Sequence, residues 1–334
     1  MSTIGGNLGL SSPAQISDKA FDKLITAFAA YVDEGKEITK ALNNPVVKKM
    51  AHLYDIPTLV GIEIEVENIE IQLPVPDFWQ VDKDNSLRNN GKEIQSRPLT
   101  PEQAVKSLLV LWNVMNKWAK PDFSWRTSIH FHLNILELQP EELRKFLLLT
   151  LLCENLLFAY AGRDREQSIF CVPLSQSTQM SLIRAFIQKK KSVKEISGQN
   201  WLKYSAVGLF RVHDLGTIEF RHLGGTGDLK RVLMWLSFIL QLYRAAVAMP
   251  MDLLKERILD LNSSSQYYEF LASIFTPEIL QEMPVKNFQD LLATTISRAK
   301  DFFVDPVKYS GTLDESSLGK FAMKMAHGKK VKAA

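Results

Sequence analysis

The chain has 334 residues, of which 46% are hydrophobic and 23% charged, values ordinary for a soluble globular protein. Its formal net charge of +3 is too small to indicate nucleic-acid binding by itself. The basic runs at 189–191 and near the C-terminus are interpreted as solvated segments. Cys153 and Cys171 lie in apolar stretches without ligand-like spacing, which indicates reduced core residues.

No secretory signal is visible in the Gly- and Ser-rich N-terminal stretch, and two long apolar segments are interrupted by polar residues. Segment 146–161 contains Glu154 and segment 232–247 contains Arg244, and both are shorter than a spanning helix requires. We therefore expect buried helices, no membrane contact and a cytoplasmic location.

Along the chain, residues 1–13 are expected to be a flexible lead-in, and 17–51 to be helical. A strand is predicted to begin after Pro57 and to run to about Leu73. Thr100 and Pro101 open a helix to about 120. A second strand at 127–136, helices at 140–161 and 181–190, a hairpin over 201–223 and a helix at 229–249 follow, and the chain from 252 is predicted to form several helices and a basic tail.

Three of these strands combine an apolar face with a specific polar face. The polar sets are Glu63, Glu65 and Glu67; His130, His132 and Asn134; and Glu219 with Arg221. If the strands share a sheet, the polar faces converge. Carboxylates with imidazoles suit Mg²⁺ or Mn²⁺ better than Zn²⁺, since no thiolate is offered, and an arginine suits phosphate.

Each set also has a simpler explanation. The glutamates of the first strand are equally expected on a solvated outer face, and Glu67 gains nothing from the other strands. The two histidines could be a structural pair, and Glu219 with Arg221 a cross-strand salt bridge. No phosphate-binding loop, dinucleotide fingerprint or nucleophile elbow is present in the sequence.

In this order the motifs resemble those of the amidoligases, carboxylate–amine ligases found widely in phages and related to glutamine synthetase. The matching motifs cover about residues 57–250. They are Gly61-Ile62-Glu63-Ile64-Glu65, Asp84-Asn85-Ser86-Leu87, Gly91-Lys92-Glu93-Ile94-Gln95-Ser96, Ser128-Ile129-His130-Phe131-His132, Lys203-Tyr204 and Thr217-Ile218-Glu219-Phe220-Arg221-His222.

The resemblance implies roles for individual residues. The implied metal ligands are Glu63, Glu65, Glu93, His130 and Glu219, and the implied catalytic residues are Arg221, Glu65 and His132. Binding of ATP phosphates is assigned to Arg221, His132, Arg163, Arg165 and Lys203. The implied cofactors are ATP and Mg²⁺ or Mn²⁺.

We accordingly predict an α+β fold with a glutamine-synthetase-like, curved, mainly antiparallel sheet and helices on its outer face. The predicted division is an N-terminal helical extension (1–50), an amidoligase-like domain (51–250) and a C-terminal helical segment with a basic tail (251–334). The predicted function is ATP-dependent ligation of a carboxylate and an amine, either of which could belong to a peptide or protein. A non-catalytic phage structural protein and a metal-dependent amide hydrolase are the alternatives.

Overall fold

A six-stranded sheet in the order β2-β3-β1-β4-β6-β5 lies at the centre of the fold, and all its neighbouring strands are antiparallel. The computed structural model describes residues 2–33, 43, 45–69, 73–261, 263–282, 291–296 and 298. The strands are β1 (Val60–Val66), β2 (Trp79–Lys83), β3 (Lys92–Ser96), β4 (Ile129–Asn134), β5 (Val207–Gly208) and β6 (Thr217–Phe220).

Strand β1 owes its central place to the alternation in its sequence. Ile62 and Ile64 are 1% and 0% exposed, so they face the core, while Glu63 points to the opposite face. β1 pairs with β3 on one side and with β4 on the other. A strand with two paired neighbours has both ladders of backbone hydrogen bonds satisfied, which fixes the direction of its side chains.

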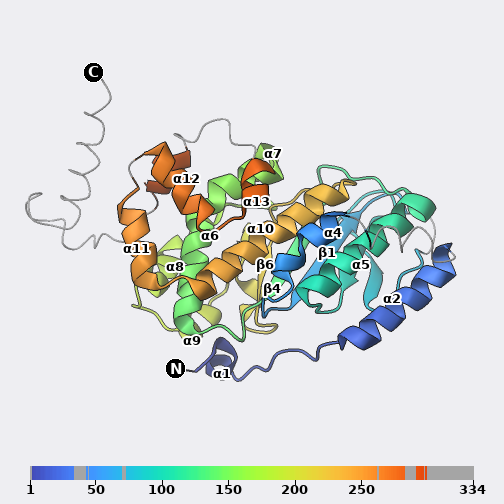
Figure 1. The fold of residues 1–334 in the computed structure, drawn as a ribbon, viewed down its shortest axis with the longest axis horizontal. Helices are drawn as coiled ribbons and strands as arrows, with labels where there is room; N and C mark the ends of the chain where they lie inside the picture. The colour runs from blue at the N-terminus through green and yellow to red at the C-terminus, as the bar shows by residue number, and fades with distance from the viewer. Residues whose placement is uncertain are drawn as a thin grey trace, which may run out of the picture.

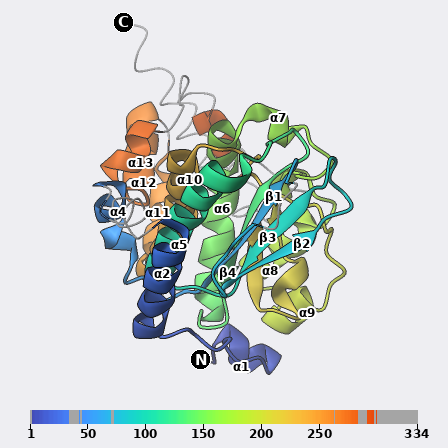
Figure 2. The same cartoon turned by 90° about the vertical axis from the view of Figure 1, so that its right-hand side faces the viewer.

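Three long helices cover the apolar face of the sheet (Figures 1 and 2). They are α5 (Pro101–Val114), α6 (Pro140–Ala161) and α10 (Leu229–Ala248). Phe146 of α6 packs against Phe220 of β6 and Tyr243 of α10, with ring centroids 5.9 and 5.7 Å apart. Such aromatic contacts bury large apolar areas and fix the helices against the sheet.

Sequence-encoded caps define where these helices begin. Thr100 and Gln103 form a reciprocal capping box at the start of α5, with Pro101 in its first turn. Asp228 accepts a hydrogen bond from the backbone of Arg231 at the start of α10. By length and composition α10 could span a membrane, but 72% of its apolar window is buried inside the protein, which is typical of a core helix.

Shorter elements surround this frame. They are α1 (Ile4–Leu8), α2 (Asp18–Asp33), α4 (Pro45–Lys49), η1 (Ala51–Leu53), the π-helical turn η2 (Met115–Ala119), α7 (Arg163–Glu166), η3 (Leu174–Gln176), α8 (Met180–Ile187), α9 (Val193–Ser197), η4 (Phe210–Val212), α11 (Met251–Leu259), α12 (Ser264–Ala272) and α13 (Pro277–Glu282).

The architecture confirms the α+β class and the long helices, and it corrects two expectations. The N-terminal stretch is not a flexible lead-in, because Ile4 is fully buried in α1 and its backbone N–H donates to the carbonyl oxygen of Leu138 at 2.8 Å. The first strand ends at Val66, earlier than predicted. The basic tail lies outside the described residues.

Candidate metal and anion site

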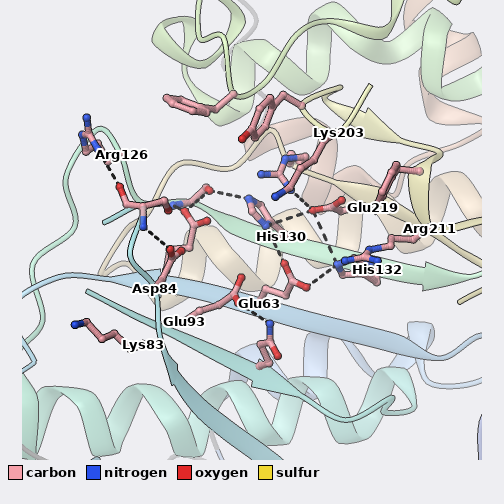
Figure 3. A pocket seen from close by; sticks show the side chains of 18 residues that line it. Glu63, Lys83, Asp84, Glu93, Arg126, His130, His132, Lys203, Arg211 and Glu219 are labelled. Carbon is pink, nitrogen blue, oxygen red and sulfur yellow. Dashed lines mark hydrogen bonds and ion pairs between the residues drawn. The ribbon is translucent and has the colours of Figure 1, made fainter. Parts of the chain in front are cut away.

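The polar face of the sheet, opposite the three long helices, forms the floor of a cavity of about 370 Å³. Figure 3 shows its lining side chains converging from the strands of the sheet and from the segments around it. The floor carries Glu63, Glu65, Glu93, Gln95, Ser128, His130, His132, Glu219 and Arg221, and the walls carry Lys83, Asp84, Ser86, Arg126, Phe170, Lys203, Tyr204, Phe210 and Arg211.

Strand register explains why residues far apart in sequence meet here. Glu63 of β1 lies opposite His130 of β4, and His132 lies opposite Glu219 of β6. Glu65 lies opposite Glu93 of β3. Directly opposed side chains on one face of antiparallel strands approach closely, so the convergence predicted from the three polar faces is present.

Glu63 is the centre of the arrangement. Its Oε2 lies 3.1 Å from Nδ1 of His130, and its Oε1 lies 3.2 Å from Nε2 of His132. Nδ1 of His130 is at hydrogen-bond distance from Oε2 and donates to it only when the imidazole carries a proton there, whereas the buried Nε2 of His132 has no hydrogen-bond partner among the described residues. Oε1 of Glu219 lies 3.4 Å from the same His130 nitrogen and 4.0 Å from Nε2 of His132.

Two groups of three residues could each hold a metal ion. One consists of Glu63, His132 and Glu219, and the other of Glu63, Glu93 and His130, with the potential ligand atoms in each group within 4.8 Å of one another. The residues fit a divalent ion, because carboxylates and imidazoles suit Mg²⁺ and Mn²⁺ and the buried Nε2 of His132 has no hydrogen bond within the described residues. Glu63 belongs to both groups and would lie between two ions.

The pKa values of the carboxylates respond to this crowding. Burial opposes ionisation of Glu63, but the imidazoles of His130 and His132 outweigh it and hold its pKa below the usual range. Burial, followed by the charges of Glu63 and Glu65, raises the pKa of Glu93 to about 7. Burial opposes protonation of His132, but its attraction to Glu63 prevails and raises its pKa. The raised pKa of Glu93 thus reflects repulsion between neighbouring carboxylates, which a bound cation would relieve.

Arg221 follows directly after β6 and supplies a guanidinium to the same floor. Its Nη1 is in very close contact with Oε1 of Glu219, and its Nε has no hydrogen-bond partner in the part of the chain that the structure describes. Its Cζ lies 5.9 Å from the ring centre of Tyr204, and Nζ of Lys203 lies 5.7 Å from that ring. Both cations line the cavity, and their contact with phosphate stays a prediction.

The structure does not bring Arg165 to the cavity. This side chain is only 4% exposed, and it donates hydrogen bonds to the carbonyl oxygens of His222 and Arg221 at 3.2 and 2.9 Å. It therefore supports the backbone that carries Arg221, and its predicted contact with phosphate has no support from its position. The side chain of Arg163 lies outside the described part of the chain.

Glu65 and Glu67 occupy different positions along β1 and beyond its end. Glu65 lines the cavity, but it belongs to neither ligand group, and its Oε2 accepts hydrogen bonds from the backbone N–H and hydroxyl of Ser128. Glu67 is not a surface residue: it is 4% exposed and accepts a hydrogen bond from the backbone N–H of Arg88 at 2.9 Å. This bond holds the loop between β2 and β3, where Asp84 lies.

Several cavity residues carry no signal of their own in the sequence. Arg126 lies on a loop, Arg211 in the short helix η4 and Lys83 at the end of β2, so no periodicity marks them. Arg126 donates a hydrogen bond to the carbonyl oxygen of Ser86 at 2.9 Å, which ties the two walls together. Its position two residues before Ser128, next to the His-x-His strand, is the one clue that the sequence offers.

An antiparallel sheet whose polar face gathers two carboxylate–imidazole groups beside a guanidinium defines a class of protein that can hold metal ions next to an anionic ligand. Residues 75–243, half of the chain, match the family described as "putative amidoligase enzyme". The chain therefore belongs to this family, and the description suggests a ligase activity. The matched region includes Glu93, His130 and Glu219, whereas Glu63 and Glu65 precede it. Among curated proteins no match to the chain was found.

Proposed function

We propose that the protein is an ATP- and Mg²⁺-dependent carboxylate–amine ligase with a glutamine-synthetase-like site. One observation carries this proposal: Glu63 belongs to both candidate ligand groups, and Arg221 contacts Glu219 of one of them. The chain also belongs to the amidoligase family. Two ions beside an arginine suit the binding of a polyphosphate. The cavity volume of about 370 Å³ lies in the range typical of ligand sites.

The proposed reaction has two steps. A substrate carboxylate attacks the γ-phosphorus of ATP, which forms an acyl phosphate and releases ADP. An amine then attacks the acyl carbon, the amide forms, and inorganic phosphate and a proton leave. Bound divalent ions would supply charge neutralisation for the phosphate oxygens.

The residues divide this work among them. Glu63, Glu93, His130, His132 and Glu219 would hold the ions. His132 was predicted to contact phosphate, and its membership of a ligand group supports a metal-binding role for it instead. Glu65, which is also predicted as a ligand, accepts a hydrogen bond from the Ser128 hydroxyl.

Next to the candidate ligand groups, Arg221 would stabilise the transferred phosphoryl group, and Lys203 would contact the phosphates of ATP. The close contact between Arg221 and Glu219 couples the guanidinium to the metal-binding floor. The amine and carboxylate could belong to a peptide or protein. A phage origin and action in the host cytoplasm, where ATP and Mg²⁺ are abundant, complete the proposal.

The decisive experiment measures ADP release from ATP and Mg²⁺ in the presence of a panel of amines and carboxylates. We compare the wild type with Glu63→Gln, which removes the charge shared by both groups, and with Glu102→Gln, which changes an exposed carboxylate on α5. Amine-stimulated ADP release that disappears only in Glu63→Gln supports the ligase.

Other results would replace this function. Absence of ATP and metal binding in the wild type would favour a non-catalytic structural protein. Amide hydrolysis that needs metal but no nucleotide, and that Glu63→Gln abolishes, would favour a hydrolase.

A further inference from the structure

A chain of short hydrogen bonds runs behind the metal groups, from Glu65 through Ser128 to His130. Oε2 of Glu65 accepts from the Ser128 hydroxyl at 2.6 Å and from its backbone N–H at 2.8 Å. The same hydroxyl oxygen lies 2.7 Å from Nε2 of His130. All three side chains are at least nine-tenths buried, with exposures of 9%, 4% and 1%.

The direction of these bonds follows from counting protons. A serine hydroxyl has one proton, and an ionised carboxylate can only accept. The Ser128 proton therefore goes to Glu65, and the hydroxyl oxygen is left to accept a proton from Nε2 of His130. When a cation takes the place of a proton on Nδ1, the imidazole carries its remaining proton on Nε2, and Nδ1 presents a lone pair.

Nδ1 points to a place where two carboxylates meet. Nδ1 of His130 lies 3.1 Å from Oε2 of Glu63 and 3.4 Å from Oε1 of Glu219. In Figure 3 the Glu63 and Glu219 side chains both approach the His130 ring. A lone pair and two carboxylates repel one another unless a proton or a cation lies between them. A divalent ion would satisfy all three.

We propose that Ser128 is a positioning residue that, anchored by Glu65, fixes the His130 tautomer with its proton on Nε2 and so prepares Nδ1 to bind a divalent ion. Metal-ligating histidines commonly donate their other ring N–H to an oxygen that sets their orientation, and losing this partner typically costs about 10- to 100-fold in metal affinity. Ser128 supplies this oxygen here. The proposal rests on the metal-binding part of the proposed function and gives Glu65 an indirect role.

The burial of Ser128 explains why its hydroxyl keeps the same two hydrogen-bond partners. Ser128 forms a β-bridge with Gly224, so its backbone is held at the end of β4. With 4% exposure, the hydroxyl has little access to water that could replace either bond. Removing it by Ser128→Ala leaves the backbone N–H bond to Glu65 in place and deletes both hydroxyl contacts, the one with Glu65 and the one with the imidazole.

The direct test reads the tautomer by NMR. The chain has six histidines, so selective ¹⁵N-histidine labelling with His130→Gln as the assignment control identifies the His130 ring signals. We expect the Mg²⁺-bound wild type to carry its ring proton on Nε2. In Ser128→Ala the Nε2 proton has lost this acceptor, so at the same Mg²⁺ concentration fewer molecules carry the metal-bound tautomer, and calorimetry shows Mn²⁺ binding weakened about 10- to 100-fold.

Matched variants separate positioning from packing. Ser128→Thr retains a hydroxyl and is expected to recover the tautomer and most of the affinity. Ser107→Ala removes another buried hydroxyl, one that donates to the carbonyl oxygen of Ala104 on α5, and should change neither. Glu65→Gln should weaken Mn²⁺ binding less than Glu63→Gln does, because Glu65 acts through Ser128.

The proposal is overturned if the wild-type ring proton is on Nδ1, if Ser128→Ala keeps wild-type Mn²⁺ affinity and tautomer, or if the wild type binds no Mn²⁺. Loss of Mn²⁺ binding in Glu65→Gln as complete as in Glu63→Gln would make Glu65 a direct ligand and also overturn it. These results are independent of ligase turnover. The expected tautomer and affinities without amine-stimulated ADP release would reject the ligase and retain the positioning role of Ser128.

Discussion

His222 offers the sharpest test of how the sheet is packed, because it is a fully buried imidazole on the face opposite the site. Its ring centroid lies 4.7 Å from that of Phe158 and 5.3 Å from that of Trp235, and neither ring nitrogen has a hydrogen-bond partner among the residues that the structure describes. Burial, with a smaller effect of Arg165, lowers the pKa of His222 to about 3. The substitution His222→Phe removes this titration and keeps an aromatic ring.

The magnitude follows from proton linkage. An unfolded-state histidine has a pKa of about 6.5, so between roughly pH 6.5 and 3 the unfolded chain binds a proton that the folded protein excludes. Stability contributed by neutral His222 is therefore lost as the pH falls through this window. From pH 7 to pH 5 the expected loss is about 2 kcal/mol, since each pH unit well inside the window costs about 1.4 kcal/mol.

Urea unfolding of both proteins at pH 7 and pH 5 measures the effect. We expect the free energy of unfolding of the wild type to fall by about 2 kcal/mol more than that of His222→Phe, because all other titrating groups are shared. Equal pH dependence in the two proteins would refute the reasoning, and would mean that the His222 ring can be protonated in the folded state.

Three further predictions concern the site, the core and a turn. Arg221→Lys should lower kcat of the proposed ligase about 100-fold, with a smaller change in KM for ATP, because a lysine cannot reproduce the bidentate hydrogen bonds of a guanidinium. An unchanged kcat in steady-state assays would mean that Arg221 does not stabilise the transition state. Burial raises the pKa of both Cys153 and Cys171 to about 12. Iodoacetamide at pH 8 should therefore label neither cysteine in the native protein and both in urea. Rapid labelling of the native protein, detected by mass spectrometry, would contradict their buried placement. Gly216 has φ of +66°, and an added Cβ would lie 2.3 Å from Cδ2 of Leu136. Gly216→Ala should therefore lower the free energy of unfolding, measured by urea titration, by about 2–4 kcal/mol. A loss below about 0.5 kcal/mol would be inconsistent with this turn.

Much of the frame was predictable because local chemistry specified it. The alternation around Ile62 and Ile64 predicts β1, and the capping box at Thr100 predicts the start of α5, as the structure confirms. The end of β1 was predicted poorly, since extended-state residues continue past Val66 and only pairing with neighbouring strands decides where a strand stops. The buried Ile4 was missed because its partners come from distant parts of the chain.

For the site, the sequence by itself determined which residue types face one way on each strand. A period of two placed Glu63, His130 and Glu219 on polar faces, since adjacent side chains on a strand alternate. Only the tertiary structure decided which of them touch. Strand order placed β4 between β1 and β6, so Glu63 reaches both histidines, and the same packing turned Arg165 to the backbone and Glu65 to Ser128. Register and strand order arise from contacts between distant segments, and no local pattern encodes them.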